Sequence, residues 1–81
     1  MITVEIIRKK LIEAIKLSGK SQTELAKELN VTQPTIAQYV SGKIMPSLDT
    51  FANLCIILDL DANDMLSIPE EKKDKKLNDT K

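Results

Sequence analysis

Apolar residues between Thr3 and Leu17 recur at the spacing of a helix that buries one stripe of its surface. This i, i+3, i+4, i+7 rhythm predicts an amphipathic helix formed on Val4, Ile7, Leu11, Ala14 and Ile15. Glycine accepts the left-handed backbone that closes a helix, so the pair Ser18-Gly19 predicts where this helix ends.

Capping residues predict a second, shorter helix after this glycine. Ser21 and Glu24 have the spacing of a capping box, in which each side chain binds the backbone N–H of the other residue. The helix is expected to run to Leu29 and to stop at Asn30, because asparagine tolerates a positive φ. Ala26, one turn before the stop, is small enough to let another helix cross closely.

A third helix, over about residues 33–41, is predicted to follow after three connecting residues. Thr32 is expected to cap it, and Pro34 falls in its first turn, where the missing N–H does no harm and the fixed φ helps. Ile36 and Tyr39 are expected to point inward. Because so short a connection makes two helices cross steeply, the pattern predicts a helix-turn-helix from Gln22 to Tyr39.

Two further helices complete an all-α pattern without strand-like alternation or internal repeats. Ser47 is expected to cap a fourth helix over residues 48–58, and Asp61 to cap a short fifth helix. We therefore expect one compact five-helix domain over residues 1–68. The remaining segment, 69–81, is highly charged and almost free of apolar residues, so we expect a disordered tail.

The composition argues against several classes of function. The chain has no His and one Cys, so neither a metal site nor an internal disulfide is expected, and Cys55 is interpreted as a buried core residue. Without His or a Gly-rich phosphate loop we predict no enzymatic activity, no cofactor and no small-molecule ligand. No apolar stretch is long enough for a membrane span, and no signal peptide is recognisable, so we predict a cytoplasmic protein.

Charge is balanced over the whole chain but not along it. Residues 1–46 carry seven Lys and Arg against four Glu, whereas residues 47–66 carry four Asp and no basic residue. This asymmetry would turn the N-terminal half toward an anionic partner such as nucleic acid and the acidic segment away from it.

Several segments match a known pattern in the register given by these predicted helices: Ser21-Gln22-Thr23-Glu24-Leu25-Ala26, Leu29-Asn30-Val31-Thr32, Ile36, Ser41-Gly42-Lys43, Pro46-Ser47-Leu48 and Asp64-Met65-Leu66. In them the chain resembles the Cro/C1-type helix-turn-helix domains of phage repressors and many bacterial regulators. The resemblance covers about residues 4–67. It implies a phage-repressor-like fold and a small prokaryotic or phage transcription regulator, repressor-like, that binds double-stranded DNA sequence-specifically.

The resemblance also implies roles for residues around the third helix, whose exposed face would lie in the major groove. Base contacts are then expected from Gln33, Pro34, Thr35 and Gln38. Phosphate contacts are expected from Gln22, which would also brace Gln33, and from Thr32, the Tyr39 hydroxyl, Ser41 and Lys43. Three alternatives stay open: the glutamines as ordinary solvated residues, Pro34 as a helix starter only, and the Tyr39 ring as a core residue.

The chain departs from the family pattern at two positions that change together. Many relatives carry an arginine in the first helix and a glutamate near the end of the third, where this chain has Ile15 and Val40. An apolar contact thus replaces a charge pair, a change that is often neutral or stabilising. Ile12 stands at a further position where relatives often hold a basic residue, so one phosphate contact is missing.

One recognition helix reads too few bases to find a single site in a genome, so such domains usually bind as dimers to two half-sites. We therefore expect a homodimer on an inverted-repeat operator, with an interface formed by Ala52 and Ile56 and flanked by Ile44 and Met45. The alternative is that these are scattered surface residues. A second function also stays open: a protein–protein interaction module, such as an antirepressor or bridging factor, which the balanced net charge and the absence of arginine from the third helix favour.

Overall fold

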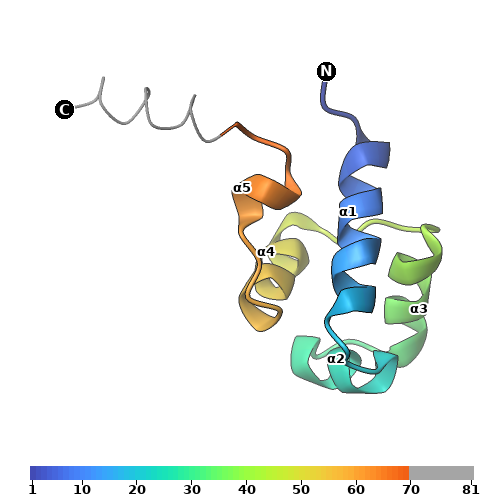
Figure 1. The fold of residues 1–81 in the computed structure, drawn as a ribbon. Coiled ribbons are helices and arrows are strands. Elements are labelled where there is room, and N and C mark those ends of the chain that lie inside the picture. The colour runs from blue at the N-terminus through green and yellow to red at the C-terminus, as the bar shows by residue number, and fades with distance from the viewer. Residues whose placement is uncertain (70–81) are drawn as a thin grey trace.

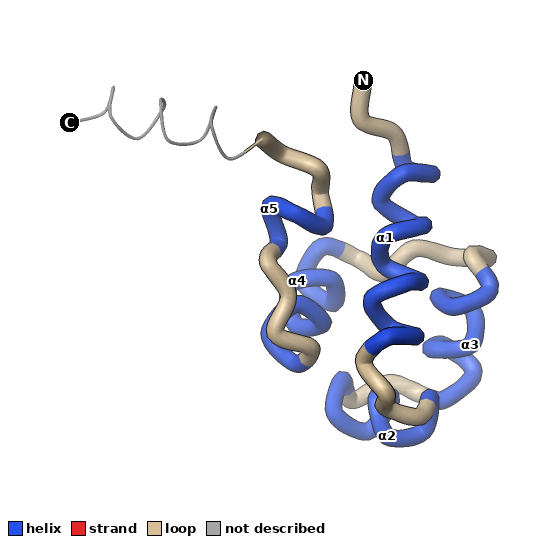
Figure 2. Tube along the Cα trace, viewed as in Figure 1, coloured by secondary structure: helices blue, strands red, loops and turns tan. Residues whose placement is uncertain are grey.

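The computed structural model describes residues 1–69, and these form five helices around one core (Figure 1). In chain order the helices are α1 (Val4–Leu17), α2 (Gln22–Leu29), α3 (Gln33–Ser41), α4 (Leu48–Ile57) and α5 (Ala62–Met65). Residues 1–69 contain no strand, which confirms the predicted all-α class (Figure 2). Of the tail predicted to be disordered, residues 70–81 lie outside the described residues.

Helix α1 stands in the middle of the arrangement, with α3 on one flank and α4 and α5 on the other (Figure 1). Helix α2 packs closely against α3 and also contacts α4. The connection from α3 to α4 therefore crosses from one flank of α1 to the other (Figure 2). The two helices of the predicted helix-turn-helix, α2 and α3, pack against each other.

Side-chain caps begin three of the helices, and those of α2 and α5 are formed by the residues predicted from the sequence. The Ser21 hydroxyl accepts from Glu24 N at 3.0 Å, and the Glu24 carboxylate accepts from Ser21 N at 3.2 Å, which completes the capping box of α2. The Thr3 hydroxyl accepts from Ile6 N at 3.4 Å, and the Asp61 carboxylate accepts from Asn63 N at 3.0 Å. These bonds satisfy N–H groups that a helix start leaves without intrahelical partners.

Thr32 and Ser47 occupy the N-cap positions of α3 and α4, but neither side chain accepts from the helix backbone, so that part of the prediction is wrong. Each hydroxyl instead contacts a polar side chain in the first turn of the helix that follows it. Thr32 Oγ1 lies 2.9 Å from Thr35 Oγ1, and the Ser47 hydroxyl donates to Asp49 Oδ1 at 2.5 Å. Local side-chain partners thus compete with the cap geometry.

Left-handed residues close α2 and α3 where they are predicted. Asn30 has φ 60° and Gly42 has φ 81°. In each case the next backbone N–H turns back to a carbonyl of the last turn, with Val31 N 2.9 Å from Ala26 O and Lys43 N 2.9 Å from Gln38 O. This Schellman-type pattern satisfies carbonyls that the helix end would otherwise leave unpaired.

Ten buried side chains form the core, drawn from all five helices. Four of them are fully buried, one each from α1, α2, α3 and α4: Leu11, Leu25, Ile36 and Leu54. The others are Ile15, Ala26, Tyr39, Phe51, Cys55 and Met65. Cys55 is therefore a core residue, as predicted, and burial raises the pKa of its thiol.

The predicted apolar stripe of α1 is buried only in part. Leu11 and Ile15 are in the core, and Ala14 packs against it, but Val4 is 52% exposed. The burial of α1 is concentrated at Leu11 and Ile15, beyond its first turn. Val4 is therefore a surface residue, and the prediction that it faces the core is wrong.

Candidate nucleic-acid interface

A tight turn fixes α3 against α2 and determines which face of α3 meets solvent. Ala26, at 4% exposed, brings the two helices close, and the left-handed Asn30 turns the chain. From α3, Ile36 and Tyr39 enter the core with 0% and 6% of their surface exposed. Because these two residues occupy the inner face, the polar residues of α3 lie on its outer face.

The four residues predicted to contact bases differ in their exposure. Gln33, Pro34 and Gln38 are exposed, and they project from the first half and the middle of α3. Thr35 is half-buried, and its hydroxyl lies 2.9 Å from that of Thr32. Three of the four side chains are thus accessible to a partner, whereas the Thr35 hydroxyl contacts Thr32 at the start of the helix.

A hydrogen bond joins the first residues of α2 and α3. Gln33 Nε2 donates to Gln22 Oε1 at 2.5 Å, so the brace that the resemblance implies is present. Each amide offers two donors and an acceptor. The bond therefore uses only the Gln22 oxygen and one Gln33 donor, and it leaves the Gln22 amide nitrogen and the Gln33 oxygen available to a ligand.

The residues predicted to contact phosphates lie at the two ends of α3. Gln22 and Thr32 lie near its N-terminal end, and Ser41 and Lys43 lie at its C-terminal end. Gln22 is half-buried, and the other three residues are exposed. The Ser41 hydroxyl donates to Gln38 O at 3.2 Å. No Lys or Arg occurs within α3, and Lys43, just beyond it, adds a positive charge at this end.

Tyr39 combines a buried ring with a hydroxyl that stays protonated. Burial, and next the negative charge of Asp49, raise the pKa of Tyr39. The phenol is therefore a hydrogen-bond donor at neutral pH, which suits a phosphate oxygen. The Tyr39 ring is therefore a core residue, as the alternative interpretation predicts. Its hydroxyl can still contact a phosphate.

Arg8 is a basic residue beside α3 that the sequence predictions missed. A Cβ atom added at Gly42 would lie 3.2 Å from Arg8 Cδ and 3.8 Å from Ile12 Cδ1, so the Arg8 side chain lies across the end of α3. The spacing of Arg8, Ile12 and Ile15 places them on one flank of α1. That spacing is the signal that would have identified Arg8.

Exposed apolar residues follow one side of α4. Ala52 and Ile56, predicted as interface residues, are both exposed, and Ile56 is 76% exposed. Leu48, one turn before Ala52, is 84% exposed and was not predicted. Of the two loop residues, Ile44 is exposed and Met45 is half-buried. The spacing of residues 48, 52 and 56 makes a continuous stripe along the helix.

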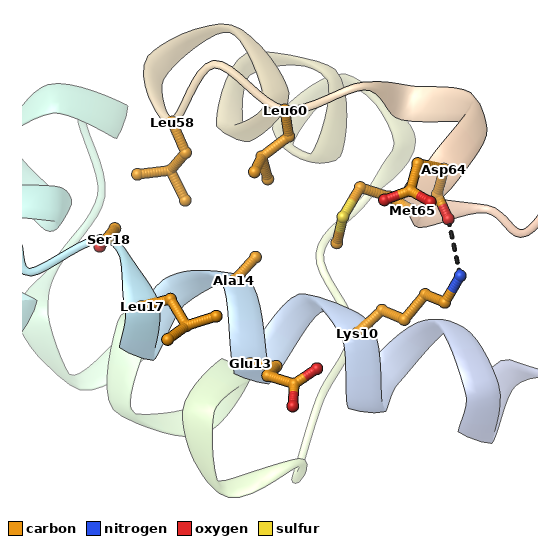
Figure 3. A pocket seen from close by; sticks show the side chains of 9 residues that line it. All are labelled: Lys10, Glu13, Ala14, Leu17, Ser18, Leu58, Leu60, Asp64 and Met65. Carbon is orange, nitrogen blue, oxygen red and sulfur yellow. Dashed lines mark hydrogen bonds between the residues drawn. The ribbon is translucent and has the colours of Figure 1, made fainter.

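On the other flank of α1 lies an open groove of about 460 Å³, which is bordered by the segment that joins α4 to α5 (Figure 3). Leu17, Leu58 and Leu60 give it an apolar lining, and Lys10 Nζ donates to Asp64 O at 2.9 Å at its rim. The residues that line the groove belong to α1, to α5 and to the segments that follow α1 and α4, and none of them comes from α3.

Within residues 1–69 no helix has the length and hydropathy needed to cross a membrane. The same residues contain no group of three or more potential metal-binding side chains.

Comparison with known families identifies the class of this fold. A helix-turn-helix family model matches residues 11–64, two thirds of the chain, from the middle of α1 into α5. The chain belongs to this Cro/C1-type helix-turn-helix family, whose members are DNA-binding regulatory domains and not typically enzymes. Searches among curated proteins and among solved structures gave no match.

Proposed function

We propose that this protein is a sequence-specific transcription regulator of the repressor type, which binds an inverted-repeat operator in double-stranded DNA as a homodimer. The observation that carries this proposal is the Gln22–Gln33 hydrogen bond, with Gln38 exposed on the same helix. The bond orients the Gln33 amide at the start of α3, and Gln38 presents an exposed amide in the middle of the helix. Glutamine can pair bidentately with adenine in the major groove, so α3 carries groups that discriminate between bases.

In this proposal, α3 lies in the major groove with its N-terminal half at the base edges. Gln33 and Gln38 read bases by hydrogen bonding, and the exposed Pro34 ring contacts a thymine methyl group. Thr35 contributes through its methyl group, since its hydroxyl is held by Thr32. Specificity therefore depends on two amides and two apolar contacts.

Phosphate contacts would position α3 without reading sequence. Lys43 and Ser41 bind the backbone at one end of α3, while Thr32 and the amide of Gln22 bind it at the other. The Tyr39 hydroxyl donates between these ends. Backbone N–H groups at the starts of α2 and α3 add to this set, because helix N-termini favour anions.

Dimerisation would use the apolar stripe of α4. Ala52 and Ile56, together with Leu48, present apolar surface that a second copy can cover, and Ile44 and Met45 extend it toward α3. The symmetric interface of a two-fold dimer requires a surface that can meet itself, which an apolar stripe satisfies. Two α3 helices about 34 Å apart would then meet successive turns of one face of the duplex.

The remaining expectations are part of the same proposal. Residues 1–68 act as the DNA-binding domain, and residues 69–81 follow as a charged tail. The protein works in the cytoplasm of a bacterial cell or a phage-infected host, without a cofactor, metal or small-molecule ligand. Asp61 and Asp64, at α5 on the flank of α1 opposite α3, face away from the DNA and reduce non-specific binding.

Selection from a pool of random duplexes at physiological salt tests the proposal. The proposal predicts enrichment of an inverted repeat whose half-sites are about one helical turn apart. Enrichment of a single half-site would retain sequence-specific binding and contradict the dimer. Retention of duplexes without any enriched sequence would contradict sequence-specific regulation.

A further inference from the structure

The geometry points to Arg8 as a phosphate-binding residue that acts beside Lys43 at the C-terminal end of α3. This inference rests on the proposed DNA binding and adds a contact to it. Arg8 precedes residue 11, where the match to the family begins. The assignment therefore comes from the packing of this chain.

Arg8 lies against the end of α3 because Gly42 leaves room for it. A Cβ atom at Gly42 would approach Arg8 Cδ to 3.2 Å and Arg8 Nε to 3.9 Å, so a side chain at this position would crowd Arg8 and shift it. The adjacent Lys43 is anchored by its backbone N–H, which is 2.9 Å from Gln38 O. Arg8 from α1 and Lys43 from the loop after α3 thus bring two basic residues to the C-terminal end of α3.

The hydrogen-bonding capacity of Arg8 is largely unused. Arg8 Nε is buried and has no hydrogen-bond partner among residues 1–69, a situation that folded proteins generally avoid. Within the described part of the chain, the guanidinium makes one polar contact, from Nη1 to Glu5 Oε2 at 3.4 Å, and the Glu5 side chain is 80% exposed. A surface ion pair of this kind is weak. The guanidinium can therefore leave Glu5 at little cost and bind a stronger acceptor.

Phosphate is the acceptor that fits this place. A guanidinium carries five N–H donors in a planar fork and binds phosphate oxygens through two parallel hydrogen bonds. Ser41 and Lys43 flank Gly42 in the chain, and their hydroxyl and ammonium groups can bind phosphates of the same DNA backbone. Ile12, one turn along α1, is apolar, so Arg8 supplies the charge on this flank.

The other basic residues of α1 are placed differently. Lys10 is on the opposite flank, where its Nζ donates to Asp64 O at 2.9 Å. Lys9 and Lys16 are exposed and share a shallow surface with Ile12 and Glu13. Lys9 is thus a matched control, since it carries the same charge as Arg8 and is its neighbour in the chain.

The test measures binding of a short mixed-sequence duplex by fluorescence anisotropy as a function of salt concentration. The full chain is compared with Arg8→Ala, Arg8→Lys and Lys9→Ala. Arg8→Ala is expected to bind more weakly and to flatten the log–log salt slope by about 0.9 for each bound copy, the value for one lost phosphate contact. Lys9→Ala is expected to keep the wild-type slope, and Arg8→Lys to keep most of it.

A second pair of variants tests the exchange without altering Arg8. Glu5→Gln removes the carboxylate that competes for Arg8 and is expected to tighten binding several-fold. Glu13→Gln makes the same charge change on the outer face of α1 and is expected to have a smaller effect. This pair leaves the packing of Arg8 on Gly42 intact, so it remains informative if Arg8→Ala is unstable.

The outcomes separate this inference from the proposed function. Wild-type protein that shows no salt-dependent binding to any duplex would refute both. Wild-type binding with an unchanged slope in Arg8→Ala, or with equal losses in Arg8→Ala and Lys9→Ala, would refute the role of Arg8 alone. Equal effects of Glu5→Gln and Glu13→Gln would also overturn it.

Discussion

Ile15 and Val40 provide a direct test of how α1 is registered against α3. Ile15 is 4% exposed in the core, and Val40 packs against the same core from α3. Ile15→Arg would place an unpaired cation in this apolar environment, and a second change, Val40→Glu, would supply its partner. We expect the single variant to be strongly destabilised and the double variant to recover part of the loss.

The size of the effect follows from the burial of the two positions. An unpaired buried charge costs about 3–5 kcal/mol, which is a large share of the roughly 5–15 kcal/mol that stabilises a typical domain. Val40 is half-buried, so a carboxylate there can reach water, and Val40→Glu alone should cost about 1–3 kcal/mol. If the two side chains pair, the coupling energy should be about 1–3 kcal/mol.

Urea denaturation followed by far-UV circular dichroism measures these free energies for the wild type, both single variants and the double variant. Leu17→Arg is the matched control, because Leu17 is on the same helix and is 81% exposed. Its change should stay within about 0.5 kcal/mol. The reasoning is refuted if Ile15→Arg is as stable as Leu17→Arg, or if the double variant loses the full sum of the two single losses.

Three further predictions concern the interface and the helix ends. Gln38→Ala should relax base preference at one or two operator positions by about 1–3 kcal/mol, whereas Lys43→Ala should weaken binding to all duplexes alike and flatten the salt slope by about one unit; identical behaviour of the two variants would contradict their separate roles. Gly42→Ala should lower the unfolding free energy by more than Gly19→Ala in the same urea assay, because both have positive φ but only at Gly42 would the methyl group crowd α1; equal losses would contradict the packing. Burial raises the pKa of Tyr39 above its ordinary 10.0, so the native state holds that proton more tightly than the unfolded state and stability should fall as pH rises above 10.0; Tyr39→Phe should lessen this alkaline loss, and an unchanged pH profile would contradict it.

Features that depend on a few neighbouring residues could be predicted from the sequence. The capping box of Ser21 and Glu24 and the left-handed Asn30 are both found where they are expected. Each is determined by backbone geometry within a few residues, so little of the rest of the fold can change it. The inward position of Ile36 and Tyr39 also follows from helical spacing, since one face of α3 must be buried.

Features that depend on contacts between helices could not be predicted in the same way. Val4 continues the apolar stripe of α1, yet it is exposed, because burial depends on where the other helices pack. The hydroxyls of Thr32 and Ser47 bind nearby side chains, a competition that N-cap preference alone does not resolve. The spacing of Arg8 indicates its flank of α1, but its packing on Gly42 depends on how α1 and α3 pack together.

The most direct test of sequence-specific binding is the ratio of two affinities measured under the same conditions. The wild-type protein is titrated at physiological salt against a duplex that carries the selected inverted repeat and against a duplex with the same bases in scrambled order. The proposed function predicts binding to the repeat that is at least about 10³-fold tighter. Equal affinity for the two duplexes would contradict it.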